Sequence, residues 1–292
     1  MFKGSFTALI TPFKGSKVDE DAFVRLVEWQ IKEGTHGLVP CGTTGESPTL
    51  STEEHKRVIA LCIETAKKRV PIVAGCGSNS TEEAIDLTRF AKDAGADATL
   101  QVMPYYNKPT QEGLFQHFKA IAAETELPLI LYSIPGRCGV EIAVDTVKRL
   151  AGHCPNIVAI KEAGGSCDRV SQLRAALDRH FNILSGDDSL TLPFMSVGAE
   201  GVISVASNLI PREVSHMVDY FRSGRPDAAL KLHAKFYPLF KDLFIETNPV
   251  PVKAALAMLG QVEENYRLPL VRMSAKNRAV LQATMKACGV LK

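Results

Sequence analysis

A lysine at the end of an apolar run is the residue of this sequence best suited to covalent chemistry. Lys161 follows the run IVAI at 157–160, and a continuous apolar run is typical of a strand buried in a parallel sheet. Burial lowers the pKa of a lysine amine, which leaves it neutral and able to attack a carbonyl carbon. A lysine that only extends its charge from a strand end to solvent fits the spacing equally well. Lys161 is therefore a candidate for Schiff-base chemistry.

Hydroxyls, phenols and an arginine follow three other apolar runs. The loop GTTGES at 42–47 can turn backbone N–H groups toward a carboxylate, although an ordinary glycine-rich connection has equal weight. The segments PYYNKP at 104–109 and YSIPGR at 132–137 hold phenols that can relay protons or simply pack at strand ends. Arg137 carries a planar fork that binds a carboxylate, with a surface ion pair as the alternative. With an amine, this set suits a 2-oxo acid.

Small residues accompany the last two apolar runs. Gly186 lies in SGDD at 185–188 and Ile203 in GVIS at 201–204, and both segments allow backbone groups to approach a substrate. Asp187 equally fits the N-cap of a following helix.

Eight short apolar or β-branched runs predict strands that are buried on both faces, as in a parallel sheet covered by helices. They lie at 5–10, 37–40, 72–74, 98–103, 129–132, 157–160, 182–184 and 202–205.

Helical patterns follow most of these runs. Capping boxes are expected at Ser51 with Glu54 and at Ser80 with Glu83. One apolar helix face consists of Val58, Ile59, Cys62 and Ala66.

Eight β–α units in succession predict an α/β fold, a (β/α)8 TIM barrel followed by a C-terminal helical domain. An open doubly wound sheet is the alternative, but no GxGxxG turn follows the first strand. Strand signals stop near Pro211, and helical segments follow to Phe221 and at 236–244, 252–259 and 275–285. We expect the barrel at residues 1–224, with the active site at the carboxyl ends of its strands, and the helical domain at 225–292.

Composition excludes several classes of function. The formal net charge is only +2, which argues against nucleic-acid partners and anionic membranes. No apolar stretch approaches the roughly 18 to 20 residues of a membrane span, and the N-terminus does not resemble a signal peptide. Seven scattered cysteines without a CxxC pair, and seven dispersed histidines, predict neither disulfides nor a metal. We expect a cytoplasmic protein.

Taken in order, the segments GTTGES, PYYNKP, YSIPGR, IKEAGG, SGDD and GVIS resemble the dihydrodipicolinate synthase family, as does NPVPVK at 248–253. The resemblance covers nearly the whole chain. It implies condensation of pyruvate with L-aspartate 4-semialdehyde, the first committed step of the diaminopimelate and lysine pathway, without a cofactor. It also implies a homotetramer built from tight dimers.

The resemblance assigns four catalytic residues. Lys161 matches the lysine that forms the imine with pyruvate, and Thr43, Tyr132 and Tyr106 match the proton relay. Tyr106 is expected to reach across the tight dimer interface into the neighbouring site, so that activity would require the dimer.

The resemblance also implies the substrate contacts. Thr44 and the backbone of Thr43 match the cradle for the pyruvate carboxylate, and Arg137 matches the group that receives the semialdehyde carboxylate. Gly186 and Ile203 match main-chain contacts. Ser133 departs from the family, which usually has Asn beside the tyrosine.

L-Lysine is a further expected ligand, because family members that respond to it bind it at the tight dimer interface. The matching positions here are Ser47, Pro48, Thr52, His55, Asn79, Glu83 and Tyr105. Thr52 departs from the histidine of some sensitive members, and Glu83 also fits a capping-box role. We expect weak to moderate inhibition.

Two alternatives remain open at this point. Sister enzymes such as N-acetylneuraminate lyase are similar around GTTGE and the lysine, although Arg137 favours a second substrate with a carboxylate. A catalytically silent barrel that serves as a binding subunit is the hypothesis from another class.

Overall fold

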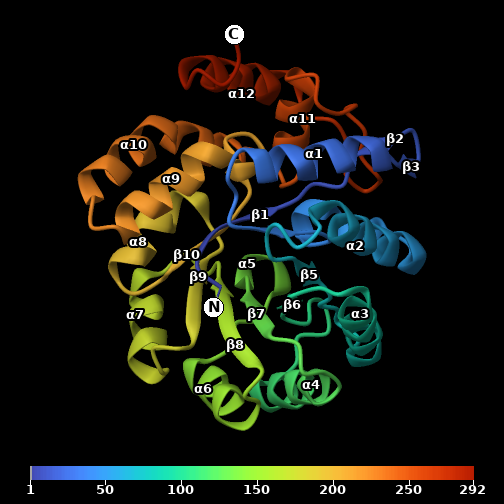
Figure 1. Ribbon diagram of the computed structural model, residues 1–292, viewed down its shortest axis with the longest axis vertical. Helices are drawn as coiled ribbons and strands as arrows, with labels where there is room; N and C mark the ends of the chain where they lie inside the picture. Colours follow the sequence, from blue (N-terminus) through green and yellow to red (C-terminus); the bar gives the residue numbers. More distant parts are fainter. Residues whose placement is uncertain (1) are drawn as a thin grey trace.

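Eight parallel strands close into a barrel, as the sequence predicts (Figure 1). The computed structural model describes residues 2–292. The strands follow the order β4-β1-β10-β9-β8-β7-β6-β5, and a parallel bridge between Leu38 and Ile72 closes the ring. The alternative of an open doubly wound sheet is therefore wrong. The strands are β1 (Gly4–Ala8), β4 (Gly37–Val39), β5 (Val73–Gly75), β6 (Ala98–Val102), β7 (Leu129–Ser133), β8 (Ile157–Glu162), β9 (Asn182–Ser185) and β10 (Gly201–Ser204).

Strand residues alternate between the barrel interior and the surrounding helices. In β8, Ala159 belongs to the buried cluster inside the barrel, whereas Ile160 belongs to the cluster that includes helix side chains. Because side chains of a strand alternate with period two, Lys161 faces the interior with Ala159. Glu162 faces outward, where its carboxylate pairs with Arg169 at 2.9 Å.

Helices cover the outside of the barrel (Figure 1). The capping box at Ser51 and Glu54 is confirmed, and the predicted apolar face of α2 is buried. The helices around the strands are α1 (Glu20–Lys32), α2 (Thr52–Ala66), α3 (Thr81–Ala94), α4 (Gln111–Ala123), α5 (Pro135–Cys138), α6 (Val144–His153), α7 (Cys167–Ala176), α8 (Thr191–Ser196) and α9 (Pro211–Arg222). Short 3-10 turns are η1 (Thr43–Gly45), η2 (Ser47–Thr49), η3 (Asp188–Leu190) and η4 (Ala206–Asn208).

A small antiparallel hairpin, β2 (Phe13–Lys14) with β3 (Lys17–Val18), precedes α1 and is absent from the sequence prediction. Strands of two residues are too short to show an alternating pattern. Gly15 supplies the positive φ of 59° in its turn.

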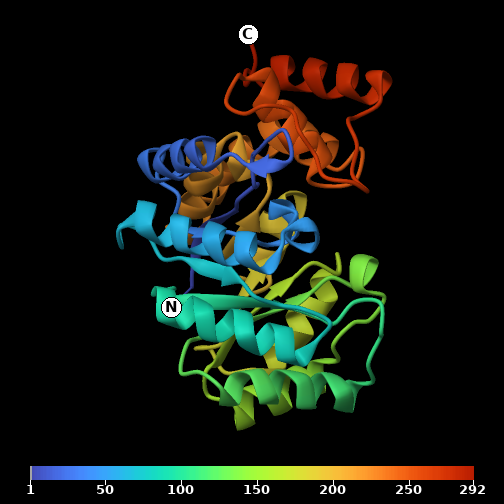
Figure 2. The same ribbon diagram turned by 90° about the vertical axis from the view of Figure 1, so that its right-hand side faces the viewer.

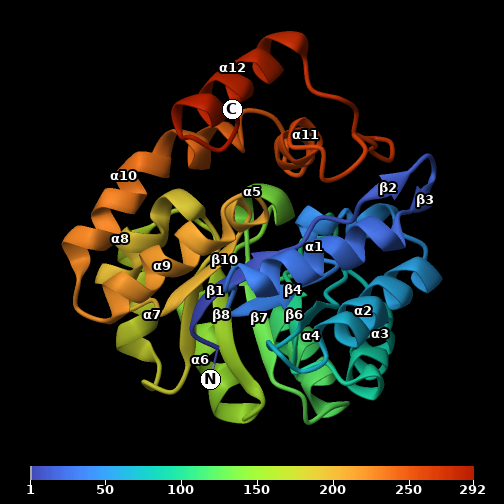
Figure 3. The same cartoon turned by 45° about the horizontal axis from the view of Figure 1, so that its top comes forward.

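Three further helices follow the barrel: α10 (Pro226–Asp242), α11 (Val250–Met258) and α12 (Ala275–Ala287). The predicted helices at 236–244, 252–259 and 275–285 are confirmed, although α10 begins ten residues earlier than its apolar stretch. In Figure 2, α11 and α12 lie at the end of the molecule opposite α4 and α6. Figure 3 shows α10 leading away from the barrel toward α12 and α11.

No helix within residues 2–292 has both the length and the apolar character that crossing a membrane requires.

Candidate active site

Lys161 and Tyr132 lie side by side inside the barrel. They are register partners on β8 and β7, and the Lys161 Nζ lies 4.1 Å from the centre of the Tyr132 ring. Both side chains are buried, with only 5% of each residue exposed. The strand continues one residue beyond Lys161, to Glu162, so Lys161 lies within the strand and not after it.

Burial lowers the pKa of Lys161 to about 7. The negative charge of Asp188 opposes this effect, while the positive charge of Arg137 adds to it. A large fraction of the amine is therefore neutral near pH 7, as a nucleophile for a carbonyl carbon requires. This geometry favours the functional interpretation of Lys161 over a strand-end lysine that reaches solvent.

Tyr132 is the phenol nearest to this amine. Burial raises its pKa to about 12, and a hydrogen bond with the Thr43 side chain acts in the opposite direction. A proton can pass between a neutral phenol and a hydroxyl that is hydrogen-bonded to it. The structure thus brings together three of the four residues expected to be catalytic.

Thr43 and Thr44 begin the 3-10 turn η1, which follows β4. The first N–H groups of a helical turn have no partner within it, so they are available to an oxygen of a ligand. The Thr44 hydroxyl is buried and accepts a hydrogen bond from Asn248 Nδ2 at 3.0 Å. These features suit a carboxylate-binding loop, with the Thr44 side chain fixed from behind.

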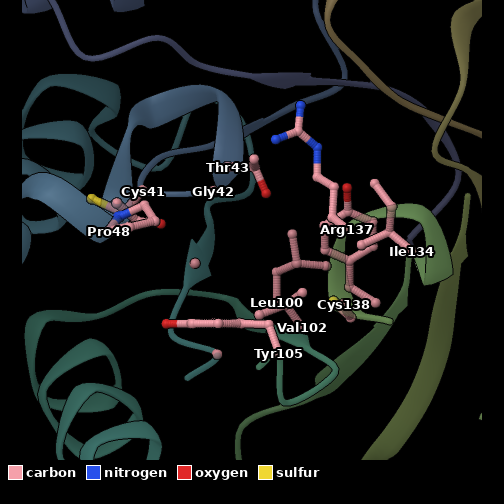
Figure 4. Close-up of a pocket in the computed structure, with 14 residues that line it drawn as sticks. Cys41, Gly42, Thr43, Pro48, Leu100, Val102, Tyr105, Ile134, Arg137 and Cys138 are labelled. Carbon is pink, nitrogen blue, oxygen red and sulfur yellow. The ribbon is translucent and has the colours of Figure 1, made fainter. Parts of the chain in front are cut away.

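A cavity of about 200 Å³ opens beside Tyr132 and Thr43, and Arg137 lines it as well. Figure 4 shows Thr43 and Arg137 projecting from different segments, the loop after β4 and the short helix α5. Arg137 is largely exposed, and one of its terminal nitrogens donates to the Asn248 carbonyl oxygen at 3.0 Å. Its remaining N–H groups are available to a carboxylate in the cavity.

Gly186 and Ile203 adjoin the same end of the barrel. A Cβ on Gly186 would lie 3.1 Å from the Lys161 Cε and 2.6 Å from the Ala163 Cβ, so a side chain there would crowd the amine. Ile203 is buried in β10 and packs in the interior cluster.

Tyr106 is not part of this group within one chain. Its side chain is 90% exposed, and its φ of 72° lies in the left-handed region. The neighbouring Tyr105 lines the cavity instead, as Figure 4 shows. The expectation that Tyr106 acts in a partner's site stays a prediction.

Two residues near the site were not identified from the sequence. Asp188 is 1% exposed and accepts hydrogen bonds from the Ser204 hydroxyl and from the N–H groups of Val205 and Ala206. Burial raises its pKa to about 6. The residue pattern predicts an N-cap role only for its neighbour Asp187, and Asp187 does cap η3.

Asn248 is the second such residue. It is 5% exposed and contacts both Thr44 and Arg137, which lie more than 100 residues away in sequence. In the sequence, Asn248 belongs to the NPVPVK segment of the family resemblance, but nothing there assigns it a contact with the site.

A second cavity of about 290 Å³ adjoins the first and contains most of the residues expected to bind lysine. Ser47, Pro48 and Tyr105 line both cavities. Thr52, His55 and Glu83 line only the second one, and Asn79 contacts its wall by donating to the Tyr105 carbonyl oxygen at 3.2 Å.

The capping box predicted at Ser80 and Glu83 is half wrong. The Ser80 hydroxyl accepts from the Glu83 N–H at 3.4 Å, but the Glu83 carboxylate accepts from the Ser78 hydroxyl. This closer donor takes the place of the backbone group, and the carboxylate faces the second cavity. His55 is buried there and its Nε2 lies 2.7 Å from the Gly75 oxygen.

No cluster of three or more His, Cys, Asp or Glu side chains with a metal-binding arrangement occurs in the part of the chain that the structure describes.

Comparison with known proteins gives a consistent result. Residues 1–288 match the sequence model of the dihydrodipicolinate synthetase family. A curated relative from Thermodesulfovibrio yellowstonii, named 4-hydroxy-tetrahydrodipicolinate synthase, is 52% identical over 292 residues and is covered completely, as is this chain. The solved structure of the 4-hydroxy-tetrahydrodipicolinate synthase from Methylacidiphilum fumariolicum SolV is 57% identical with a TM-score of 0.98, covering 99% of this chain and 96% of that one. A lysine-bound structure from Cyanidioschyzon merolae is 42% identical with a TM-score of 0.97, covering 99% of each chain.

Proposed function

The chain belongs to the dihydrodipicolinate synthetase family, and we propose that it carries out its reaction on an imine between pyruvate and the side-chain nitrogen of Lys161. It is an enzyme of the 4-hydroxy-tetrahydrodipicolinate synthase type. Such an enzyme condenses pyruvate with L-aspartate 4-semialdehyde in the diaminopimelate route to lysine. Relatives at about 50% identity favour this activity over the sister enzymes and the silent barrel.

Imine formation is the first step. The neutral amine of Lys161 attacks the C2 carbonyl carbon of pyruvate, and the carbonyl oxygen leaves as water after proton transfers. Tyr132 and Thr43 carry these protons, because the phenol lies beside the amine and hydrogen-bonds to the hydroxyl. Thr44 and the backbone of Thr43 hold the pyruvate carboxylate.

Carbon–carbon bond formation is the second step. A proton leaves the methyl group of the bound pyruvate, and the resulting enamine carbon attacks the aldehyde carbon of the second substrate, whose oxygen takes a proton. Arg137 binds the carboxylate of that substrate, since it lines the cavity and one terminal nitrogen alone is engaged by Asn248. Gly186 and Ile203 provide main-chain contacts.

Ring closure is the last step. The amino group of the second substrate attacks the imine carbon, the bond to Lys161 breaks, and the amine is released in its starting form. Covalent activation by the lysine makes a separate cofactor unnecessary.

The observation that carries this proposal is the buried Lys161 amine beside the Tyr132 phenol. Its test is mass spectrometry after incubation with pyruvate and borohydride, with the adduct mapped by digestion. We expect a reduced adduct on Lys161 and none in Lys161→Arg, which keeps the charge but removes the nucleophile. A coupled assay should then show turnover with aspartate semialdehyde and not with N-acetylneuraminate. A folded protein without the adduct would overturn the mechanism.

A homotetramer of tight dimers is the proposed assembly, with Tyr106 completing the neighbouring site. The support is the position of Tyr106, which is 90% exposed and does not line the cavity of its own chain. L-Lysine is the proposed effector of the second cavity, which has a carboxylate at Glu83 to receive an amine. The lysine-bound relative from Cyanidioschyzon merolae supports this assignment.

We further propose that residues 1–224 form the catalytic barrel domain and residues 225–292 a separate helical domain. Gly224, with a φ of 75°, lies between α9 and α10 at this boundary. A cytoplasmic location fits the seven cysteines, all of which carry free thiols.

A further inference from the structure

A fully buried ion pair connects the GTTGES loop to helix α11. The Lys253 Nζ lies 2.5 Å from the Glu46 Oε1, and both side chains are 0% exposed. Burial lowers the pKa of Lys253, and the Glu46 carboxylate opposes that effect. The Lys253 nitrogen also lies 4.2 Å from the centre of the Phe13 ring. Neither charged residue has a part in the reaction steps above.

Stability alone does not account for such a pair. Removing two charges from water is costly, and an apolar pair of similar volume is often as stable or more stable. A buried pair does, however, fix the relative position of the two segments that carry it, because either charge left alone would be strongly unfavourable. The ion pair therefore positions the groups that these two segments carry.

On one side, Glu46 immediately follows the turn that holds Thr43 and Thr44. Its backbone is in the left-handed region, with φ 53° and ψ 34°, and its N–H donates to the Thr43 oxygen at 3.1 Å. The second carboxylate oxygen accepts from the Arg267 N–H at 3.2 Å. The carboxylate thus anchors the hydroxyl-bearing turn to two points of the C-terminal region.

On the other side, Lys253 lies in the first turn of α11, and Asn248 shortly precedes that helix. Its N–H donates to the Pro249 oxygen at 3.0 Å. Asn248 in turn donates to the Thr44 hydroxyl and accepts from Arg137, both at 3.0 Å. The segment 248–253 therefore contacts both the pyruvate-binding loop and the arginine for the second substrate.

We propose that Glu46 and Lys253 are positioning residues, whose ion pair holds segment 248–253 against the GTTGES loop and so sets the distance between Thr43, Thr44 and Arg137. The inference rests on the proposed functions of those three residues. A displacement of about 1 Å among groups that bind and orient substrates can lower a rate about 10²-fold. Loss of the pair should have an effect of that kind without removing any group that touches a substrate.

The test compares Glu46→Gln, Lys253→Met and the double variant. Each single change leaves a buried charge with a weaker partner or none, so we expect lower thermal midpoints, most of all for Lys253→Met. The double variant removes both charges and should regain most of the midpoint. Its kcat/KM should nevertheless stay about 10- to 100-fold below that of the unaltered enzyme, with higher KM values for both substrates.

The exposed pair Arg149–Glu112, between helices α6 and α4, supplies a control outside the site. The double variant Glu112→Gln with Arg149→Met should keep kcat and both KM values. Borohydride trapping at saturating pyruvate separates the two proposals: the Glu46 and Lys253 variants should still form the Lys161 adduct. Absence of the adduct in the unaltered enzyme would instead refute the proposed mechanism.

Unchanged kcat and KM values in the folded double variant would overturn the positioning role. If the double variant does not fold, Glu46→Gln is measured alone. Its amide oxygen can accept a hydrogen bond from Lys253, so this single variant should fold. We expect about tenfold lower kcat/KM in that variant, and kinetics equal to the unaltered enzyme would refute the proposal.

Discussion

The side-chain nitrogen of Lys161 lies over the face of the Tyr132 ring, 4.1 Å from its centre. An aromatic face stabilises a cation, whereas burial disfavours one. Burial lowers the pKa of Lys161 to about 7, so a large fraction of the amine over this ring is neutral near pH 7. The same burial raises the pKa of Tyr132 to about 12, so that the phenol keeps its proton beside a partly neutral amine.

Imine formation should follow the neutral fraction of Lys161. With a pKa of about 7, the initial rate of adduct trapping should rise about tenfold from pH 6 to pH 8 and then level off. A lysine with an ordinary pKa would show a rise of about 100-fold over the same range, without a plateau. The measurement is mass spectrometry of cyanoborohydride-trapped protein at fixed pyruvate concentration. A continued rise above pH 8 would contradict the assigned pKa.

Tyr132→Phe should lower kcat by about 10²- to 10⁴-fold, the usual contribution of a positioned proton-transfer group. The lysine remains in place, so slow adduct trapping should persist and the thermal midpoint should change little. Tyr220→Phe, on helix α9 outside the cavity, is the matched control and should keep full activity. Steady-state kinetics would test this, and a Tyr132→Phe enzyme of normal rate would exclude the relay.

Mixing two inactive variants should restore activity if Tyr106 acts across the dimer interface. In a heterodimer of Tyr106→Phe with Lys161→Arg, one site combines an intact lysine with an intact partner tyrosine. Random exchange of subunits should then recover about a quarter of the original sites. Activity after co-refolding of the two variants is the measurement. No recovery, with heterodimers verified by mass spectrometry, would mean that Tyr106 serves its own chain or neither.

Glu83→Gln should weaken inhibition by lysine without lowering the uninhibited rate. Glu83 lines the second cavity, and a hydrogen bond to a charged group is worth about 1.5–3 kcal/mol, so the half-inhibitory concentration should rise at least about tenfold. Glu82→Gln is the control, because Glu82 shares the first turn of α3 but does not line the cavity. If saturating lysine leaves the initial rate of the unaltered enzyme unchanged, the effector assignment is wrong.

The barrel and its amine could be predicted from the sequence because their signals are local. Strands buried on both faces appear as continuous apolar runs, and Lys161 extends one of them. The capping box at Ser51 was recognisable for the same reason, since its partners are three residues apart. The resemblance of the loop segments then supplied the expected substrates and roles.

Only the tertiary structure revealed which side chains meet from distant segments. Tyr105 lines the cavity, whereas the adjacent Tyr106 is 90% exposed and has a backbone with positive φ. Glu83 turns to Ser78 instead of completing its capping box.

Asn248 and Lys253 reach Thr44 and Glu46 across 204 and 207 residues. Residue type and spacing determine the periodicity of an element and the ends of a helix, since these depend on hydrogen bonds and burial within a few residues. Contacts over such separations depend on how the closed barrel packs against its C-terminal helices. No local sequence pattern indicates that packing. The sequence by itself therefore determined the barrel and the position of its amine, whereas the tertiary structure determined which side chains surround that amine.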